Sequence, residues 1–188
     1  MLEQLDSYFN RYASFSVSEI ESIFESLKIE TYDKKSFLLE ASQTCHYKFF
    51  IFSGLVRTYY LEAGSEFVTQ FAIENWWVTN MESFVLQEPS LLNIQALEPS
   101  KIGLLHRDKL EQLYKTSPNL ERAFRMMAEN MLIAVQRKSD FFMKKDAEEK
   151  YQNLVSKIPN LTQRVPQYMI ASYLEMTPEH LSSLRKKK

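Results

Sequence analysis

Cysteine and glycine are scarce in this chain of 188 residues, and each shortage excludes a class of protein. The single cysteine, Cys45, excludes an intramolecular disulfide and any iron–sulfur or zinc site made only of cysteines from one chain. The three glycines, Gly54, Gly64 and Gly103, lie too far apart for a glycine-rich phosphate loop. The composition therefore fits a protein of a reducing compartment, and we expect no cofactor.

Long apolar runs are missing as well. No segment approaches the roughly 20 consecutive apolar residues that a membrane-spanning helix needs. The N-terminus, MLEQLDSYFN, lacks the basic and then apolar layout of a signal peptide. The overall composition, 45% hydrophobic and 25% charged, is that of an ordinary soluble protein. We therefore expect a cytoplasmic protein with no membrane partner.

The formal net charge of −1 hides a separation of charge along the chain. Residues 119–188 contain 13 lysines and arginines against 8 aspartates and glutamates, a net charge of +5. Residues 1–118 contain 10 against 16, a net charge of −6. Because contacts with nucleic-acid phosphates are local, a basic segment matters more for DNA binding than the total charge does. The separation favours a nucleic-acid interface near the C-terminus, with a solubilising tail as the alternative.

Two helices followed by several short strands are expected in the first half of the chain. Residues 2–28 repeat apolar side chains at helical spacing, and Ser16 and Glu19 have the spacing of a capping box. Runs rich in aromatic and β-branched residues predict strands at Phe49–Phe52, Val56–Leu61, Phe67–Ile73, Leu91–Leu97 and Lys101–His106. We therefore expect an α+β protein whose N-terminal part is an antiparallel β-roll of the jelly-roll type.

A long helix with an apolar stripe is predicted after the roll. A short helix over residues 107–117 ends before Pro118, and the long helix begins near Asn119. Steps of four and three residues separate its apolar side chains, which are Leu120, Phe124, Met127, Met131, Ala134 and Phe141. The stripe packs either on the roll or on the same helix of a second subunit. We expect the second arrangement, a homodimer that places two DNA-reading helices roughly 34 Å apart.

The stretch from Val165 to Lys188 predicts two short helices joined by a tight turn, preceded by a helix over residues 146–158. Thr177 can cap the second short helix, and Pro178 suits its first position. Its leucines fall three residues apart and face inward, so that its polar side chains face outward. The pattern predicts a helix-turn-helix whose second helix enters a DNA major groove. A capped helical end without DNA binding is the alternative.

Other candidate sites have weaker support. His46 and His106 are isolated from further metal ligands, so we expect no metal site. No nucleophile can be paired with a base, and we expect no enzyme activity. We expect Cys45 to be a small buried residue rather than a redox sensor. The aromatic residues around Trp76 and Trp77 either fill a core or line an apolar ligand pocket.

Several stretches of the chain, taken in order, resemble the Crp/Fnr family of bacterial transcription regulators. They are FIFSGLVRTYYL (Phe50–Leu61), NWWVTNMESF (Asn75–Phe84), NIQALE (Asn93–Glu98) and IASYLEMTPEHLSSLRKKK (Ile170–Lys188). The resemblance spans nearly the whole chain and is closest to the short members common in Bacteroidetes. It implies a cyclic-nucleotide-binding-like sensor β-roll at residues 1–118, a dimerisation helix at 119–145 and a helix-turn-helix DNA-binding domain at 146–188.

The sequence departs from the members that bind cyclic nucleotides. Those members hold the ribose and cyclic phosphate with a Gly-Glu pair and a later Arg-Ser or Arg-Thr pair, where this chain has Thr79-Asn80 and Ser90-Leu91. A buried phosphate without the arginine loses its charge-assisted partner, so we expect no binding of cyclic AMP. The resemblance still implies a pocket for an unknown effector, lined by Trp77, Thr79, Asn80, Ser90 and Leu91.

The helix-turn-helix also departs from the family pattern. Glu175 replaces the usual glycine of the turn, which implies either a different turn geometry or a strained backbone. Glu179 matches the family's glutamate, whereas Pro178 and Ser183 stand where some members have arginine. We expect base contacts from Glu179, His180, Ser182 and Ser183. We expect phosphate contacts from Thr177, Arg185, Lys186, Lys187 and Lys188.

The sequence therefore predicts a homodimeric transcription regulator that reads an inverted-repeat operator. Its expected partners are double-stranded DNA, a second copy of the chain and, by resemblance, RNA polymerase. A β-roll that binds a ligand or a partner protein without binding DNA is the alternative.

Overall fold

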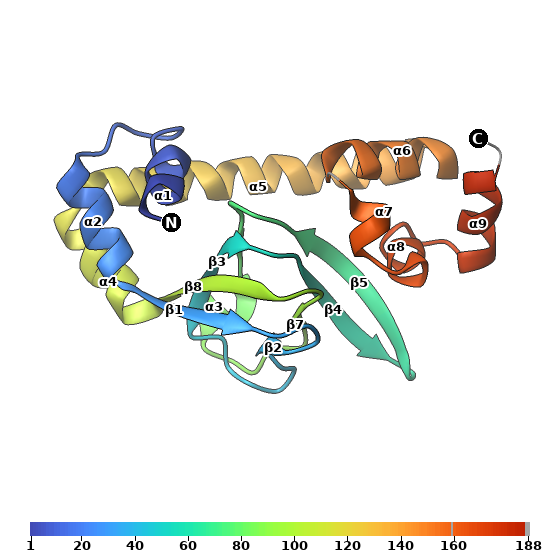
Figure 1. The fold of residues 1–188 in the computed structure, drawn as a ribbon, viewed down its shortest axis with the longest axis horizontal. Coiled ribbons are helices and arrows are strands. Elements are labelled where there is room, and N and C mark those ends of the chain that lie inside the picture. The colour runs from blue at the N-terminus through green and yellow to red at the C-terminus, as the bar shows by residue number, and fades with distance from the viewer. Residues whose placement is uncertain (159, 187–188) are drawn as a thin grey trace.

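A computed structural model describes residues 1–158 and 160–186, except for the side chains of Phe141, Phe142 and Lys186. The helices are α1 (Leu2–Phe9), α2 (Val17–Glu25), α3 (Met81–Leu86), α4 (Arg107–Thr116), α5 (Pro118–Lys144), α6 (Ala147–Lys157), α7 (Leu161–Arg164), α8 (Gln167–Tyr173) and α9 (Pro178–Lys186). Figure 1 shows α5 running along one side of the molecule, with the strands below it and α7, α8 and α9 at one end. Among the described helices, none is both long enough and apolar enough to cross a bilayer.

Two antiparallel sheets form the β-roll. Their strands are β1 (Leu27–Tyr32), β2 (Phe37–Leu39), β3 (Tyr47–Ser53), β4 (Val56–Glu62), β5 (Ser65–Ala72), β6 (Trp77–Val78), β7 (Asn93–Ala96) and β8 (Ser100–His106). The strand orders are β1-β8-β3-β6 and β2-β7-β4-β5. The strands predicted from the aromatic and β-branched runs correspond to β3, β4, β5, β7 and β8, and the expected fold class is confirmed.

The turn between β3 and β4 requires glycine. Gly54 has a φ of +103°, which side chains disfavour, and a Cβ at this position would overlap the side chain of Ser100. The amide of Gly54 also donates a hydrogen bond to Glu74 Oε1 over 3.1 Å. This turn therefore fixes the end of the β3–β4 hairpin against two other parts of the roll.

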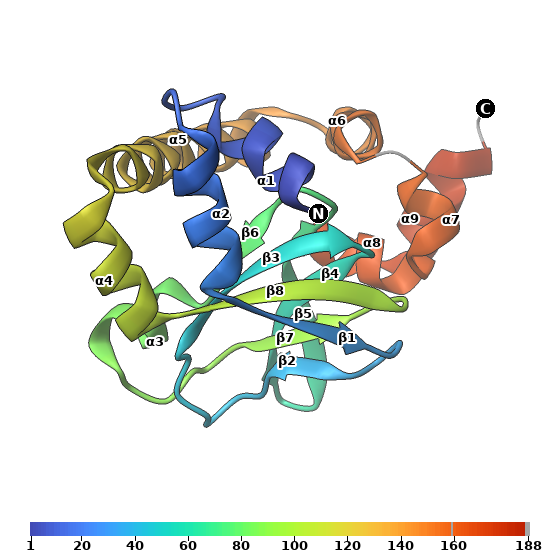
Figure 2. The ribbon, with the colours of Figure 1, turned by 60° about the vertical axis from the view of Figure 1, so that its left-hand side comes forward.

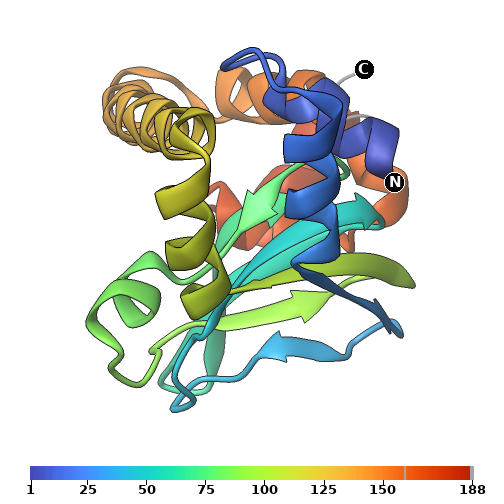
Figure 3. The ribbon, with the colours of Figure 1, turned by 90° about the vertical axis from the view of Figure 1, so that its left-hand side faces the viewer.

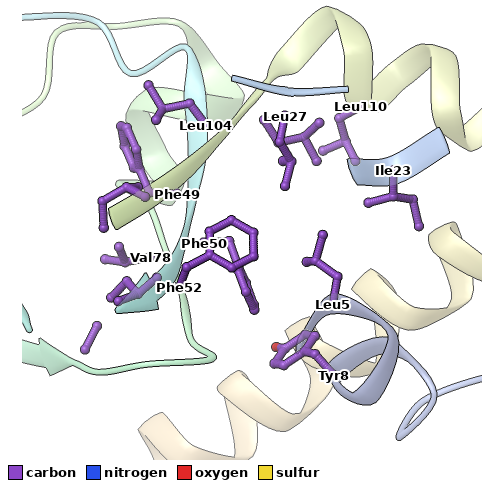
Figure 4. Close-up of a cluster of buried hydrophobic side chains, with 14 of the residues drawn as sticks. Leu5, Tyr8, Ile23, Leu27, Phe49, Phe50, Phe52, Val78, Leu104 and Leu110 are labelled. Carbon is purple, nitrogen blue, oxygen red and sulfur yellow. The ribbon is translucent and has the colours of Figure 1, made fainter. Parts of the chain in front are cut away.

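The N-terminal helices complete the core on the outer face of the first sheet. The predicted capping box begins α2, with Ser16 Oγ accepting from the amide of Glu19. Leu5 and Phe50 are fully buried, and the ring of Tyr8 lies 5.4 Å from the ring of Phe50 in an edge-to-face arrangement. Figure 4 shows these side chains converging from α1, α2 and the strands.

The first half of the α5 stripe packs inside its own protomer. Leu120 is fully buried, the ring of Phe124 lies 5.4 Å from that of Trp77, and the Tyr8 hydroxyl lies 3.2 Å from Met127 Sδ. The prediction that Leu120 contacts a second subunit is therefore wrong, because the helix already uses this residue to close its own core. The prediction for Phe141 concerns a side chain outside the described residues.

The second half of α5 exposes apolar side chains. Met131 is 50% exposed, Leu132 60% and Val135 56%, and Ala134 is also exposed. Lys138, which interrupts the stripe, turns toward the roll, donates to the carbonyl of Thr69 over 3.3 Å and lies over the ring of a tyrosine in α8. A surface available to a partner therefore begins one turn after Met127.

A second core joins the C-terminal helices to the roll. Leu55, Tyr59, Val68 and Phe71 of the roll lie in one buried cluster with residues of α6 to α9, including Leu161, Ile170, Ala171, Leu174 and Leu181. The Ser172 hydroxyl strengthens the contact, since it donates to the carbonyl of Glu66 over 2.9 Å and accepts from the amide of Val68 over 3.0 Å. The helix α8 is thus docked on β5.

Candidate DNA interface and effector cavity

The turn between α8 and α9 keeps the geometry that glycine normally supplies. Glu175 has a φ of +57°, and the amide of Met176 reaches back to the carbonyl of Ala171 over 3.0 Å, as in a Schellman C-cap. Of the two outcomes expected for Glu175, the structure shows the strained backbone rather than a different turn. Left-handed backbone costs a non-glycine residue roughly 1–2 kcal/mol.

The helix α9 is capped and anchored as its sequence predicts. Thr177 Oγ1 accepts from the amide of His180 over 3.2 Å, and Leu181 is fully buried against α8. Three of the four predicted base-reading residues, Glu179, His180 and Ser183, are exposed, whereas Ser182 is half-buried. The Ser183 hydroxyl donates to the carbonyl of Glu179 over 3.0 Å, which leaves its lone pairs for an outside donor.

The predicted phosphate contacts are only partly described. Thr177 and Arg185 are exposed, and Arg185 lies 3.5 Å from Gln167 Oε1. Lys187, Lys188 and the side chain of Lys186 lie outside the described residues. Figure 1 shows α9 at the outer end of the molecule, beyond α8 as viewed from the roll.

Two residues at the start of α8 were missed by the sequence prediction. Gln167 Nε2 donates to the carbonyl of Pro178 over 3.1 Å, so Gln167 ties the start of α8 to the start of α9. Tyr168 is 52% exposed beside it. Their place directly after Pro166, at the start of a predicted helix, was the available signal.

Arg164 of α7 holds the C-terminal helices to the roll. Its guanidinium lies 2.8 Å from Glu74 Oε1 and 2.6 Å from Glu98 Oε1, and its Nε donates to Glu98 Oε2 over 3.2 Å. Burial raises the pKa of Glu74, but hydrogen bonds from its own amide and from Arg164 outweigh burial and hold that pKa below its usual value. The hydrogen bonds with Glu98 raise the pKa of Arg164 in turn.

The residues predicted to line one effector pocket are separated in the structure. Asn80 and Ser90 are buried and bonded to each other over 2.7 Å, and Asn80 caps α3 by accepting from the amide of Ser83. Leu91 is 78% exposed. Grouping Asn80, Ser90 and Leu91 around a ligand is therefore wrong: the first two complete the fold and the third faces solvent.

Trp77 and Thr79 do line a cavity. Its volume is about 830 Å³, and its wall is formed by α1, the β5–β6 connection, β6 and one side of α5. Figures 2 and 3 show α1 and α5 lying over β6 and β3. The cavity also includes Lys48, a lysine inside an otherwise apolar strand. The sequence prediction did not include Lys48 among the pocket residues.

The remaining candidates, Cys45, His46 and His106, have the following surroundings. Cys45 is 1% exposed, as expected, and its Sγ lies 3.3 Å from the Thr79 hydroxyl. The rings of His46 and His106 stack 6.2 Å apart, and His46 Nδ1 lies 3.0 Å from Gln87 Oε1. In the described part of the chain, no three potential metal ligands come together.

Comparison with known proteins identifies the fold. Residues 29–117 match the family model described as the cyclic nucleotide-binding domain. No curated protein sequence matches the chain. A solved structure of the c-di-GMP-responsive global regulator CLP from Xanthomonas campestris has 15% identity and a TM-score of 0.72, over 92% of this chain and 91% of that one.

Further solved structures agree. FixK2 from Bradyrhizobium japonicum has 16% identity and a TM-score of 0.72, over 86% of this chain and 83% of that one. The catabolite activator protein of Thermus thermophilus has 14% identity and a TM-score of 0.61, over 94% and 84%. CLP is described as a global regulator and the Thermus thermophilus protein as a catabolite activator protein. The chain therefore has the fold of Crp/Fnr-type regulators, with a cyclic nucleotide-binding-type domain at residues 29–117.

Proposed function

We propose that this protein is a homodimeric transcription regulator that reads an inverted-repeat operator through α9. One observation carries the proposal: α9 is anchored by Leu181, capped by Thr177 and exposes Glu179, His180 and Ser183 at the outer end of the molecule. A helix held in this way can enter a major groove with its first turns against base edges. The positive charge of residues 119–188 supports the same role.

The exposed residues of α9 divide into two roles. The Glu179 carboxylate is an acceptor for the N4 amino group of cytosine, and the hydroxyl of Ser183 suits several bases. Arg185 lies one to two turns further along, where a cation contacts phosphates without reading sequence. Tyr168, which is 52% exposed at the start of α8, offers a further hydroxyl donor. Specificity is thus assigned to Glu179 and affinity largely to the cations.

The dimer is supported by the exposed half of α5. Met131, Leu132 and Val135 are each at least half exposed, and they lie within a single turn and a half of one helix. Grouped apolar side chains of this kind mark a surface that a partner covers. A second copy of α5 would cover them and would relate the two copies of α9 by a two-fold axis.

Selection of bound sequences from a random duplex pool, followed by a salt titration of the selected duplex, tests this function. We expect an inverted repeat whose affinity falls steeply with salt, because each phosphate contact releases counterions. The absence of any enriched sequence from a folded dimer would contradict the proposal and favour a β-roll that acts on a partner protein or ligand.

Glu179→Ala is expected to relax base preference at one position of each half-site. Losing the carboxylate should cost about 1–3 kcal/mol on the selected sequence, because a cytosine amino group loses its acceptor. The measurement is a competition assay in which every base is tried at each operator position. Glu148→Ala, which removes an exposed carboxylate from α6, is the matched control and should leave the preferences unchanged. Equal weakening on all sequences would show that Glu179 does not read bases.

We also propose that the roll does not bind cyclic AMP. The positions where a cyclic phosphate would need a cation hold Asn80 and Ser90, which are bonded to each other, and Leu91, which faces solvent. A phosphate placed there would have no charge-assisted donor. Calorimetric titration with cyclic AMP is expected to show no binding, and an affinity in the micromolar range or tighter would refute this.

A further inference from the structure

The cavity beneath α5 holds an unusual lysine. Lys48 of β3 is 8% exposed, and its Nζ lies 3.8 Å from Met81 Sδ and over the aromatic rings of Phe84 and Phe124, at 4.6 and 5.6 Å from their centres. Among the described residues, no carboxylate forms an ion pair with it. A buried ammonium without an anion is costly, and burial lowers the pKa of Lys48.

A second donor without a partner belongs to a residue of the same cavity wall, although the donor atom itself is covered. Trp77 Nε1 is buried, and it is the one buried side-chain nitrogen or oxygen in the described residues that has no hydrogen-bond partner. In the antiparallel pairing of β3 with β6, Trp77 lies opposite Phe50, two residues from Lys48. Residues two apart in a strand project to the same face, so Lys48 and Trp77 share one wall of the cavity. Buried polar groups normally have partners.

The protein's own acids do not supply the missing acceptor. Glu74 lines the cavity, but its carboxylate is bonded to Arg164 and to the amide of Gly54. Glu121 also lines it from an exposed position on α5. The other cations of the wall have neighbours already, since Arg11 lies 4.3 Å from the ring of Tyr8 and Arg125 is paired with Glu129 over 2.6 Å.

We propose that this cavity binds a small amphiphile with one carboxylate group, whose oxygens accept hydrogen bonds from Lys48 Nζ. Its apolar body lies against Phe124, Met127 and Met131 of α5. One lysine matches a single negative charge, whereas a doubly charged phosphate would keep one charge unpaired in an apolar site. That this ligand is the effector of a regulator rests on the proposed function, whereas its binding to the cavity does not.

The test compares decanoate with decan-1-ol, which share a chain length and differ in the carboxylate. Both tryptophans of the chain, Trp76 and Trp77, line the cavity, so intrinsic fluorescence reports directly on occupancy. We expect the intact protein to bind decanoate more tightly than decan-1-ol. Lys48→Met keeps the length of the side chain and removes its charge, and it is expected to weaken decanoate binding by about 10- to 100-fold while decan-1-ol binding changes little.

Lys101→Met is the matched control, because Lys101 is a strand lysine on the exposed side of β8. It should leave the preference for decanoate intact. The Lys48→Met variant is expected to fold, because the change removes a buried charge. A thermal unfolding measurement on the same samples checks this. Failure of the intact protein to bind decanoate, equal binding of the acid and the alcohol, or a Lys48→Met variant that keeps the preference would each overturn the proposal. None of these outcomes bears on DNA binding, which is measured separately.

Discussion

Replacing Leu132 and Val135 together by aspartate is expected to convert the dimer into monomers and to weaken binding to the selected inverted repeat by about 100-fold or more. These side chains are 60% and 56% exposed in the protomer, so the change does not disturb its own core. In a dimer they would be buried, where four unpaired carboxylates are strongly unfavourable. Each freed protomer would then bind one half-site alone. In the dimer, binding of one protomer raises the effective concentration of the other at the second half-site.

Sedimentation equilibrium and titration with the full operator and with one half-site measure the two effects. The half-site affinity should be nearly unchanged, which separates loss of the dimer from loss of the DNA-binding surface. Leu91→Asp is the matched control, because Leu91 is 78% exposed in the connection between α3 and β7, outside α5, and should leave both measurements unaltered. A dimer that survives the double change, or an intact protein that is itself monomeric, would contradict the proposed interface.

The strands that could be predicted are those rich in aromatic and β-branched residues, and in β3 these residues form a continuous buried run. Phe49, Phe50 and Ile51 of β3 are all at most 1% exposed, because both faces of this strand are covered, and their aromatic and β-branched side chains stand out in the sequence. The missed strands gave a weaker signal. β1 alternates charged and half-buried residues at the edge of its sheet, and β6 is only two residues long.

The periodicity of α5 predicted the helix but not its partner. The spacing of apolar side chains along a helix indicates that the stripe is buried, but it does not show whether the same protomer or a second copy buries it. Leu120 and Met131 belong to the same stripe, yet one is fully buried and the other half exposed. The printed sequence does not show that α1 reaches Phe124 and Met127 but not Met131, because these contacts depend on the tertiary arrangement.

The cavity was harder to predict than the helix-turn-helix. The residues of α8 and α9 are neighbours in sequence, so caps and spacing place them. Lys48 and Trp77 come to the same wall of the cavity only through the pairing of β3 with β6. The charge of Lys48 within the run Tyr47–Ser53 was the one local clue, because a lysine in an otherwise apolar strand needs a reason to be buried.

Glu74 connects the cavity with the C-terminal helices. It lines the cavity and it is bonded to Arg164, while Lys138 reaches from α5 to both β5 and α8. A ligand that moves the β5–β6 connection would therefore change the contact that positions α8 and α9. Such control requires the ligand to bind one arrangement of the C-terminal helices more tightly than the other.

Arg164→Met is expected to loosen the C-terminal helices from the roll and to lower the melting temperature of their docked arrangement. The change leaves Glu74 and Glu98 close together without a cation, and the lost charge-assisted bonds should cost about 2–3 kcal/mol, near the low end because both carboxylates are partly solvated. Differential scanning calorimetry should show a fall of about 5–10 °C or a second, earlier transition. Arg185→Met, at an exposed arginine of α9, is the control and should change little.

The same contact predicts a pH dependence of defined sign. The pKa of Glu74 is lower in the folded protein than its ordinary value of 4.5, so the ionised form favours the docked state. The contribution of ionised Glu74 to the stability of the docked state is complete above about pH 4.5. It is lost as the pH falls through the pKa that Glu74 has in the folded protein. In Arg164→Met the guanidinium no longer lowers that pKa, and the melting temperature should fall less steeply on acidification than in the intact protein. Parallel curves for the two proteins would show that Arg164 does not stabilise the ionised Glu74.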